Sequence, residues 1–158
     1  MTKQYDIYFG LDKPYSVDGV IMAFDFGTKK IGVAVGQAIT KTATPLKPIL
    51  VKEGAHYWQA LEALINTWRP KALIVGVPVH KETLKEPITK KAIQFAKQLK
   101  QRSKLPVFGV DETLTSFSAR QALYEIGGSR LIKKHSIDSI AATLILESWL
   151  TMTIGEQA

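Results

Sequence analysis

Four acidic residues are the side chains in this sequence that are best suited to catalysis. Asp25 interrupts an apolar run, in the segment FDFG (24–27). A lone carboxylate in such a run carries a desolvation cost of several kcal/mol unless it is paired or binds a metal ion. Asp111 and Glu112 directly follow another apolar run, and Asp138 falls in the first turn of a predicted helix. These positions are strand ends and a helix start, where distant stretches of a chain can converge.

The chemistry that such acids support is phosphodiester hydrolysis. The reaction needs a nucleophilic water and a stabilised leaving oxygen, and two divalent ions about 3.5–4 Å apart can supply both. Mg²⁺ or Mn²⁺ prefers a few carboxylate ligands. We therefore predict that Asp25, Asp138 and one of Asp111 and Glu112 bind the metal and are catalytic. Side chains alternate along a strand, so only one of the adjacent pair is expected to reach the ion.

Each acid also has a purely structural interpretation. Asp25 could cap the following turn through its backbone amides. Asp111 and Glu112 could cap the start of the next helix. Asp138 could interact favourably with the dipole at the N-terminus of its helix. Glu147 lies half a helix circumference from Asp138 and is left out of the site. The sequence has no GxSxG, P-loop or GxGxxG motif, and its three histidines form no metal-ligand spacing.

Two basic clusters flank the predicted acids. Lys29 and Lys30 follow the Asp25 segment, and a second group precedes Asp138, namely Arg130, Lys133 and Lys134. The net charge of +7 and the pI of about 9.6 favour a polyanionic partner. We predict that both clusters contact a nucleic-acid backbone. The alternative for any one of these residues is a solubilising surface charge.

The apolar periodicity predicts the elements that hold these residues. Short apolar runs predict strands over 20–26, 31–35, 43–50, 72–77 and 106–110. Helical spacing predicts helices over 56–69, from Pro87 onward, over 116–126 and over 137–150. A hairpin meander followed by alternating helices and strands gives an α/β fold with a mixed five-stranded sheet and helices on both faces. We expect an extension over 1–19, one domain over 20–152 and a tail over 153–158.

The composition narrows the class of protein. The chain of 158 residues has no cysteine, which excludes disulfides and thiol catalysis. No apolar run approaches the roughly 18 residues of a membrane span, and the N-terminus lacks the pattern of a signal peptide. We expect a cytoplasmic protein with no membrane partner, and a monomer or weak dimer because no oligomer interface stands out.

Four segments in order resemble one known family. They are MAFDFGTKKIGVAVG (22–36), IVGVP (74–78), DETLTS (111–116) and IDSIAA (137–142). Together they resemble the YqgF (RuvX) family of RuvC-like nucleases, and the resemblance runs from about Val20 to Leu150. It implies an RNase H-like fold and the same acids as metal ligands. It also implies 5′-end maturation of pre-16S ribosomal RNA within pre-ribosomal particles, or cleavage of branched DNA by a Holliday-junction resolvase.

Two departures from the family pattern bear on activity. Thr113 stands where the family usually has arginine, so we expect a weaker phosphate contact there, which a lysine or arginine elsewhere would have to supply. In the related RuvC proteins the strand beside the first one ends in an acid, whereas here the corresponding segment is Gly76-Val77-Pro78, with His80 and Glu82 as the nearest polar residues. These departures favour a third interpretation, a non-catalytic RNA- or ribosome-binding module. An ATPase of the actin-like type is disfavoured because it needs two such domains.

Overall fold

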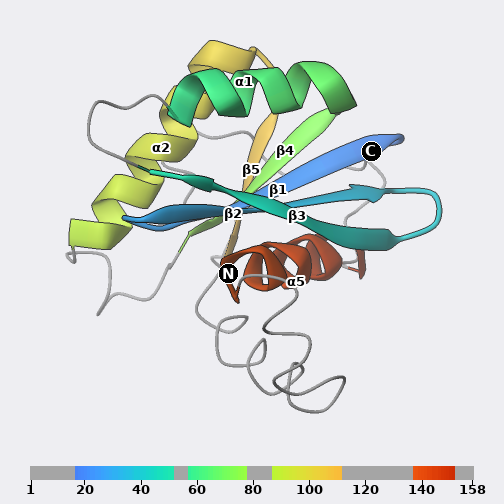
Figure 1. Cartoon of the computed structure of the whole chain (residues 1–158). Helices are drawn as coiled ribbons and strands as arrows, with labels where there is room; N and C mark the ends of the chain where they lie inside the picture. Colours follow the sequence, from blue (N-terminus) through green and yellow to red (C-terminus); the bar gives the residue numbers. More distant parts are fainter. Residues whose placement is uncertain (1–16, 52–56, 78–86, 112–136, 152–158) are drawn as a thin grey trace, which may run out of the picture.

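The chain folds around a five-stranded mixed sheet (Figure 1). The computed structural model describes residues 17–51, 57–77, 87–111 and 137–151, with the backbone alone at positions 111, 137 and 138. The elements in chain order are β1 (Val20–Phe26), β2 (Lys30–Gln37), β3 (Thr42–Leu50), α1 (Tyr57–Trp68), β4 (Ala72–Val77), α2 (Pro87–Ser103), β5 (Val107–Asp111) and α5 (Ile137–Thr151). No helix in these described parts is long and apolar enough to cross a membrane.

The sheet has the mixed topology that the sequence predicts. Its strand order is β3-β2-β1-β4-β5, with β1, β2 and β3 antiparallel and with β4 and β5 parallel to β1. The hairpin of the first two strands and the start of α2 at Pro87 are confirmed. The helix predicted over 116–126 lies outside the described residues.

Helices α1 and α2 cover one face of the sheet, called here the α1/α2 face (Figure 1). Trp58 of α1 stacks on Phe95 of α2, with ring centroids 5.5 Å apart. The Arg102 guanidinium lies 4.5 Å from the Trp58 ring centroid and 3.3 Å from Glu62. Burial in this aromatic cluster raises the pKa of Tyr57 above its usual value. The cluster therefore fixes the two helices against each other.

Trp68 is far more exposed than the other tryptophan of α1. The helical spacing groups it with the core positions, but its side chain is 39% exposed, whereas Trp58 is 6% exposed. Trp68 is the last residue of the helix, so the outer side of its ring meets solvent instead of a packed neighbour.

Helix α5 covers the opposite face, called here the α5 face (Figure 1). In its buried stretch, β2 presents the small positions Gly32, Ala34 and Gly36 to this face, which lets the helix lie close to the sheet. A Cβ atom at Gly36 would collide with the Thr42 carbonyl oxygen and would lie 2.9 Å from Leu146 of α5. The close approach of α5 thus depends on missing side chains in β2.

Strand β4 lies between β1 and β5 and is buried along its whole length. The continuous apolar run over 72–77 predicts burial on both faces, and the structure confirms it. Alternate residues of β4 enter the two cores, for example Val75 on the α1/α2 face and Ile74 on the α5 face. This alternation lets every strand position near the candidate site be assigned to a face.

Candidate active site

Asp25 is a buried carboxylate near the end of β1, with 9% of its surface exposed. Its partner in β2 is Gly32. In β4, Val75 pairs with Phe24, so the parallel register continued by one residue makes Gly76 the neighbour of Asp25. Ile21 and Ala23 belong to the core under α5, so alternation puts Asp25 on the α5 face as well. A glycine on either side leaves Asp25 with no side chain from the flanking strand positions.

Position 111 is the last residue of β5, at the same edge of the sheet as Asp25. Parallel β4 and β5 pair Gly76 with Val110 and Val77 with Asp111. Val110 belongs to the core under α5, whereas Val107 belongs to the α1/α2 core. Position 111 therefore shares the register of Val107 on the α1/α2 face, which is opposite the face of Asp25. Glu112 itself lies outside the described residues.

Ser139 fixes the start of α5 over β2 and β3. Its side chain is fully buried, accepts a hydrogen bond of 3.2 Å from the Val33 backbone N–H and donates one of 2.6 Å to the Leu46 carbonyl oxygen. Val33 and Leu46 are register partners, next to an irregularity in the β2–β3 ladder. The hydroxyl thus bridges two backbone groups of neighbouring strands and ties the helix to the sheet.

This tie also locates the backbone of Asp138. Asp138 is the second residue of α5 and directly precedes Ser139. The β1 partner of Val33 is Phe24, the neighbour of Asp25. The start of α5 therefore lies over the strand beside Asp25, at the carboxyl edge of the parallel strands. Sequence reasoning missed Ser139, although a small hydroxyl residue after an acid at a helix start is a usable signal.

Of the four predicted acids, the structure describes the side chain of Asp25 alone. Asp111 and Asp138 are described by their backbone, and Glu112 lies outside the described residues. Within the ranges that are described, no three histidine, aspartate or glutamate side chains gather as a metal site. The backbone brings the ends of β1 and β5 and the start of α5 to one edge of the sheet. That the carboxylates converge there on a metal ion stays a prediction.

The basic residues after Asp25 lie in an exposed turn. Lys29 and Lys30 are both exposed, and the Lys29 carbonyl accepts a hydrogen bond of 2.8 Å from Val51. A Cβ atom at Gly27 would lie 2.6 Å from the Lys30 carbonyl oxygen, so the turn needs glycine there. The turn presents two cations within five residues of Asp25. The second predicted basic group, Arg130, Lys133 and Lys134, lies outside the described residues.

The strand beside β1 lacks an acid, as the sequence predicts. β4 pairs with β1 in parallel and ends at Gly76 and Val77. His80 and Glu82, which follow it in the chain, lie outside the described residues. In the described part of the chain, Asp25 thus has no carboxylate at the neighbouring strand end.

Comparison with known proteins identifies similar sequences over most of the chain. The model of one family, described as "RuvX: Holliday junction resolvase", matches residues 19–152. A protein of Legionella pneumophila (strain Philadelphia 1) is 50% identical over 132 residues, which cover 84% of this chain and 95% of the relative. A protein of Haemophilus ducreyi is 46% identical over 129 residues, which cover 82% of this chain and 94% of the relative. Both carry the name "Putative pre-16S rRNA nuclease".

Solved structures share the fold at low sequence identity. The fowlpox virus resolvase in complex with Holliday junction DNA is 16% identical, with a TM-score of 0.51, over 84% of this chain and 99% of that one. RuvC of Thermus thermophilus with its Holliday junction substrate is 17% identical, with a TM-score of 0.48, over 80% of this chain and 91% of that one. The first similarity, with the strand order above, confirms the predicted RNase H-like fold.

Proposed function

Since the chain belongs to the RuvX family, we propose that it is a metal-dependent nuclease that cuts phosphodiester bonds near the 5′ end of a 16S ribosomal RNA precursor. The names of its relatives support this substrate. The observation that carries the proposal is the buried Asp25 carboxylate, flanked by glycine positions at the carboxyl edge of the sheet and beside the start of α5. Such a substrate implies a cytoplasmic protein that meets pre-ribosomal particles.

The donor set fits Mg²⁺ or Mn²⁺. Carboxylate oxygens are the ligands that these hard cations prefer, and Asp25, Glu112 and Asp138 would hold the ion. When bound, the metal supplies an activated water and neutralises charge on the phosphate. Gly32 and Gly76 contribute no side chain beside Asp25, which favours the approach of a metal ion and a phosphate oxygen.

The chain's own residues then divide the work of binding and orientation. The rigid core around β1 holds Asp25 in one position, and the Ser139 hydrogen bonds hold the start of α5. Lys29 and Lys30 attract and orient the phosphate backbone without reading its sequence. Arg130, Lys133 and Lys134 would extend that basic surface on the side of Asp138.

We infer that Glu112, and not Asp111, is the metal ligand, because alternation along β5 puts position 111 in the register of the α1/α2 face, away from Asp25. We expect Glu112→Gln to lower kcat for RNA cleavage by at least about 100-fold, because loss of a direct ligand should cost no less than loss of a supporting residue. Asp111→Asn, the matched control in the register of the opposite face, should lower it less than about 10-fold. Single-turnover cleavage with Mg²⁺ measures both. A larger loss in Asp111→Asn than in Glu112→Gln would overturn this choice.

The substrate is tested by direct comparison of two nucleic acids. We expect the purified chain with Mg²⁺ or Mn²⁺ to shorten a 16S precursor RNA at its 5′ end at least about tenfold faster than it cuts a four-way DNA junction at equal ionic strength. Preferred cleavage of the junction would instead support a resolvase. Fragment mapping on a sequencing gel identifies the cut bond in each substrate.

The missing acid at the end of β4 favours one further candidate, a non-catalytic RNA-binding module. Gly76 and Val77 occupy the strand end beside Asp25, which removes a ligand that full two-metal hydrolysis would use. Such a module would bind precursor RNA with strong salt dependence and leave it uncut with either metal. That result would replace the nuclease proposal.

A further inference from the structure

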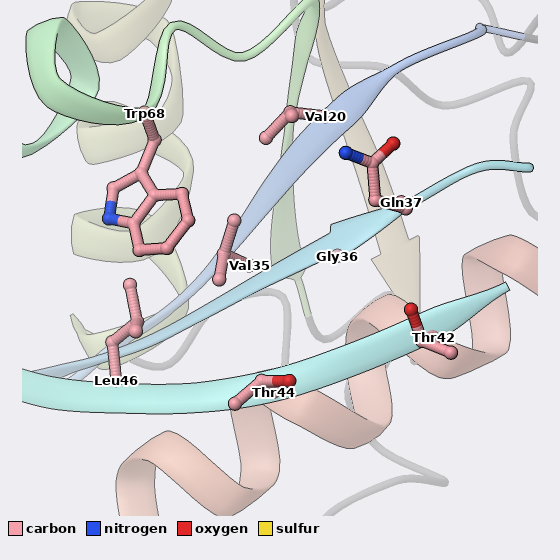
Figure 2. Close-up of a pocket in the computed structure, with 8 residues that line it drawn as sticks. All are labelled: Val20, Val35, Gly36, Gln37, Thr42, Thr44, Leu46 and Trp68. Atoms are coloured by element: carbon pink, nitrogen blue, oxygen red, sulfur yellow. The ribbon is translucent and has the colours of Figure 1, made fainter. Parts of the chain in front are cut away.

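An open pocket lies at the corner of the α1/α2 face where α1 ends (Figure 2). Its volume is about 250 Å³. Pockets for drug-sized ligands span roughly 300–1,000 Å³, so this one suits a single ring system. The pocket lies at the amino end of β1, beside Val20. Asp25 lies five residues further along the strand, which is about 17 Å, and on the other face of the sheet.

The register of three strands builds the floor of the pocket. Val20 of β1 pairs with Gln37 of β2, and Gln37 pairs with Thr42 of β3. In the next row Val35 of β2 pairs with Thr44 of β3. The floor is therefore apolar at its centre, over the valines, and carries amide and hydroxyl groups toward the sheet edge (Figure 2).

Trp68 forms the wall of the pocket opposite Gln37 (Figure 2). Its side chain is 39% exposed, whereas the other two tryptophans, Trp58 and Trp149, are 6% and 3% exposed. A partly exposed indole offers a flat π-surface, and the Gln37 amide both donates and accepts hydrogen bonds. An aromatic plane facing an amide across an apolar floor suits a planar ring with polar edges.

The surroundings of the pocket are basic. Three exposed cationic residues are neighbours of pocket residues in the chain or are hydrogen-bonded to one, namely Lys41, Arg69 and Lys71. Lys41 precedes Thr42, Arg69 follows Trp68, and the Lys71 N–H donates a hydrogen bond of 2.8 Å to the Val20 carbonyl. Asp18 is the nearby exposed acid in the described part of the chain. The excess positive charge matches a ligand that carries phosphates.

We propose that this pocket binds one unpaired nucleobase of single-stranded nucleic acid, stacked on Trp68 and with its flanking phosphates near Lys41, Arg69 and Lys71. In a duplex both faces of a base are covered, so the pocket selects ends, loops and single-stranded extensions. This inference rests on the proposed function, because that function makes a nucleic acid the partner of the chain. It adds a second contact, remote from Asp25, that anchors the substrate strand without touching the scissile phosphate.

The first test measures binding of a fluorescent single-stranded RNA decamer by anisotropy, with EDTA present to prevent cleavage. Stacking contributes about 1–3 kcal/mol per base, so Trp68→Leu should weaken binding about 5- to 100-fold, and Trp68→Phe should retain most of it. A blunt RNA duplex should bind both variants equally. Equal affinity of Trp68→Leu and the parent chain for the decamer, or an equal loss for the duplex, would overturn the proposal.

A second variant removes charge without harming the fold. Lys41 and Arg69 have backbone φ angles of +54° and +48°, a region where glycine is less strained than other residues. The Lys41→Gly/Arg69→Gly protein should keep or raise its Tm, bind the decamer more weakly and show a shallower dependence of log Kd on log salt. Unchanged affinity and salt dependence would contradict the role of these cations.

The failure of this proposal can be distinguished from failure of the nuclease proposal. Binding in EDTA does not depend on cleavage, because the pocket and Asp25 lie on opposite faces. If only the nuclease proposal fails, Trp68→Leu should still weaken binding of the decamer while the parent chain leaves RNA uncut with Mg²⁺ or Mn²⁺. The decamer should quench the tryptophan fluorescence of the parent chain and should not quench that of Trp68→Leu. Quenching that persists in Trp68→Leu would place the bound base elsewhere and refute the pocket assignment.

Discussion

Asp25→Asn is expected to lower metal-dependent cleavage of precursor RNA by at least about 100-fold while the chain stays folded. The substitution removes the charge and one metal-binding oxygen but keeps nearly the same shape, so packing around the buried side chain is preserved. Supporting residues of metal sites already contribute about 10- to 100-fold, and a direct ligand should contribute no less. Single-turnover cleavage with saturating Mg²⁺ measures the effect on kcat.

Thermal unfolding provides the control for this substitution. Without metal, Asp25→Asn should unfold with a free energy within about 1 kcal/mol of the parent chain, because it removes the cost of a buried charge along with its favourable contacts. Added Mn²⁺ should raise the Tm of the parent chain, since a ligand that binds only the folded state stabilises it, and should leave the Tm of the variant unchanged. Full cleavage activity in a folded Asp25→Asn protein would eliminate Asp25 as a ligand.

Ser139→Ala is expected to destabilise the fold by about 2–4 kcal/mol. The hydroxyl bonds the Val33 N–H and the Leu46 carbonyl inside the protein, and each buried backbone group left without a partner costs about 1–3 kcal/mol. Denaturant unfolding measures the loss. The matched control is Thr143→Val, which removes a hydroxyl that bonds only within α5, to the Ser139 carbonyl. That control should cost less than about 1 kcal/mol.

The same substitution tests whether Ser139 positions Asp138. Freed from Val33 and Leu46, the start of α5 should shift relative to β2, so the affinity for Mn²⁺ should fall about 10- to 100-fold in protein that is still folded. Titration with Mn²⁺ at a temperature well below the Tm measures this effect, and Ser139→Thr, which keeps the hydroxyl, should recover part of the affinity. A destabilised Ser139→Ala protein with unchanged Mn²⁺ affinity would restrict Ser139 to a structural role.

Most of the sheet could be predicted because its signals are local. A continuous apolar run marks β4, the Asp25 segment and Gly27 mark the end of β1 and its turn, and Pro87 marks the start of α2. These residues act through their own backbone or through burial, which periodicity reports directly. The position of Trp68 could not be predicted this way, because helical spacing does not tell how far the neighbouring elements extend beside the last turn.

The site could be predicted only as a set of residue types. Asp25 stands out in the sequence because burying a carboxylate costs free energy. Ser139 does not stand out, because its hydrogen-bond partners lie 106 and 93 positions away in the chain. No local pattern encodes such pairs. The preference for Glu112 over Asp111 likewise draws on the register of β5, which puts position 111 on the face opposite Asp25. The register is a property of strand pairing, and the segment DETLTS alone does not contain it.

The most direct test of the metal site is the anomalous scattering of Mn²⁺ in crystals of the intact chain. We predict a peak about 2 Å from an Asp25 carboxylate oxygen on the α5 face, with Glu112 and Asp138 as further ligands. The peak should be absent from crystals of the Asp25→Asn protein if Asp25 is a ligand of the metal. A peak elsewhere, with the Asp25, Glu112 and Asp138 carboxylates apart and facing separate surfaces, would contradict metal-dependent hydrolysis at this edge of the sheet.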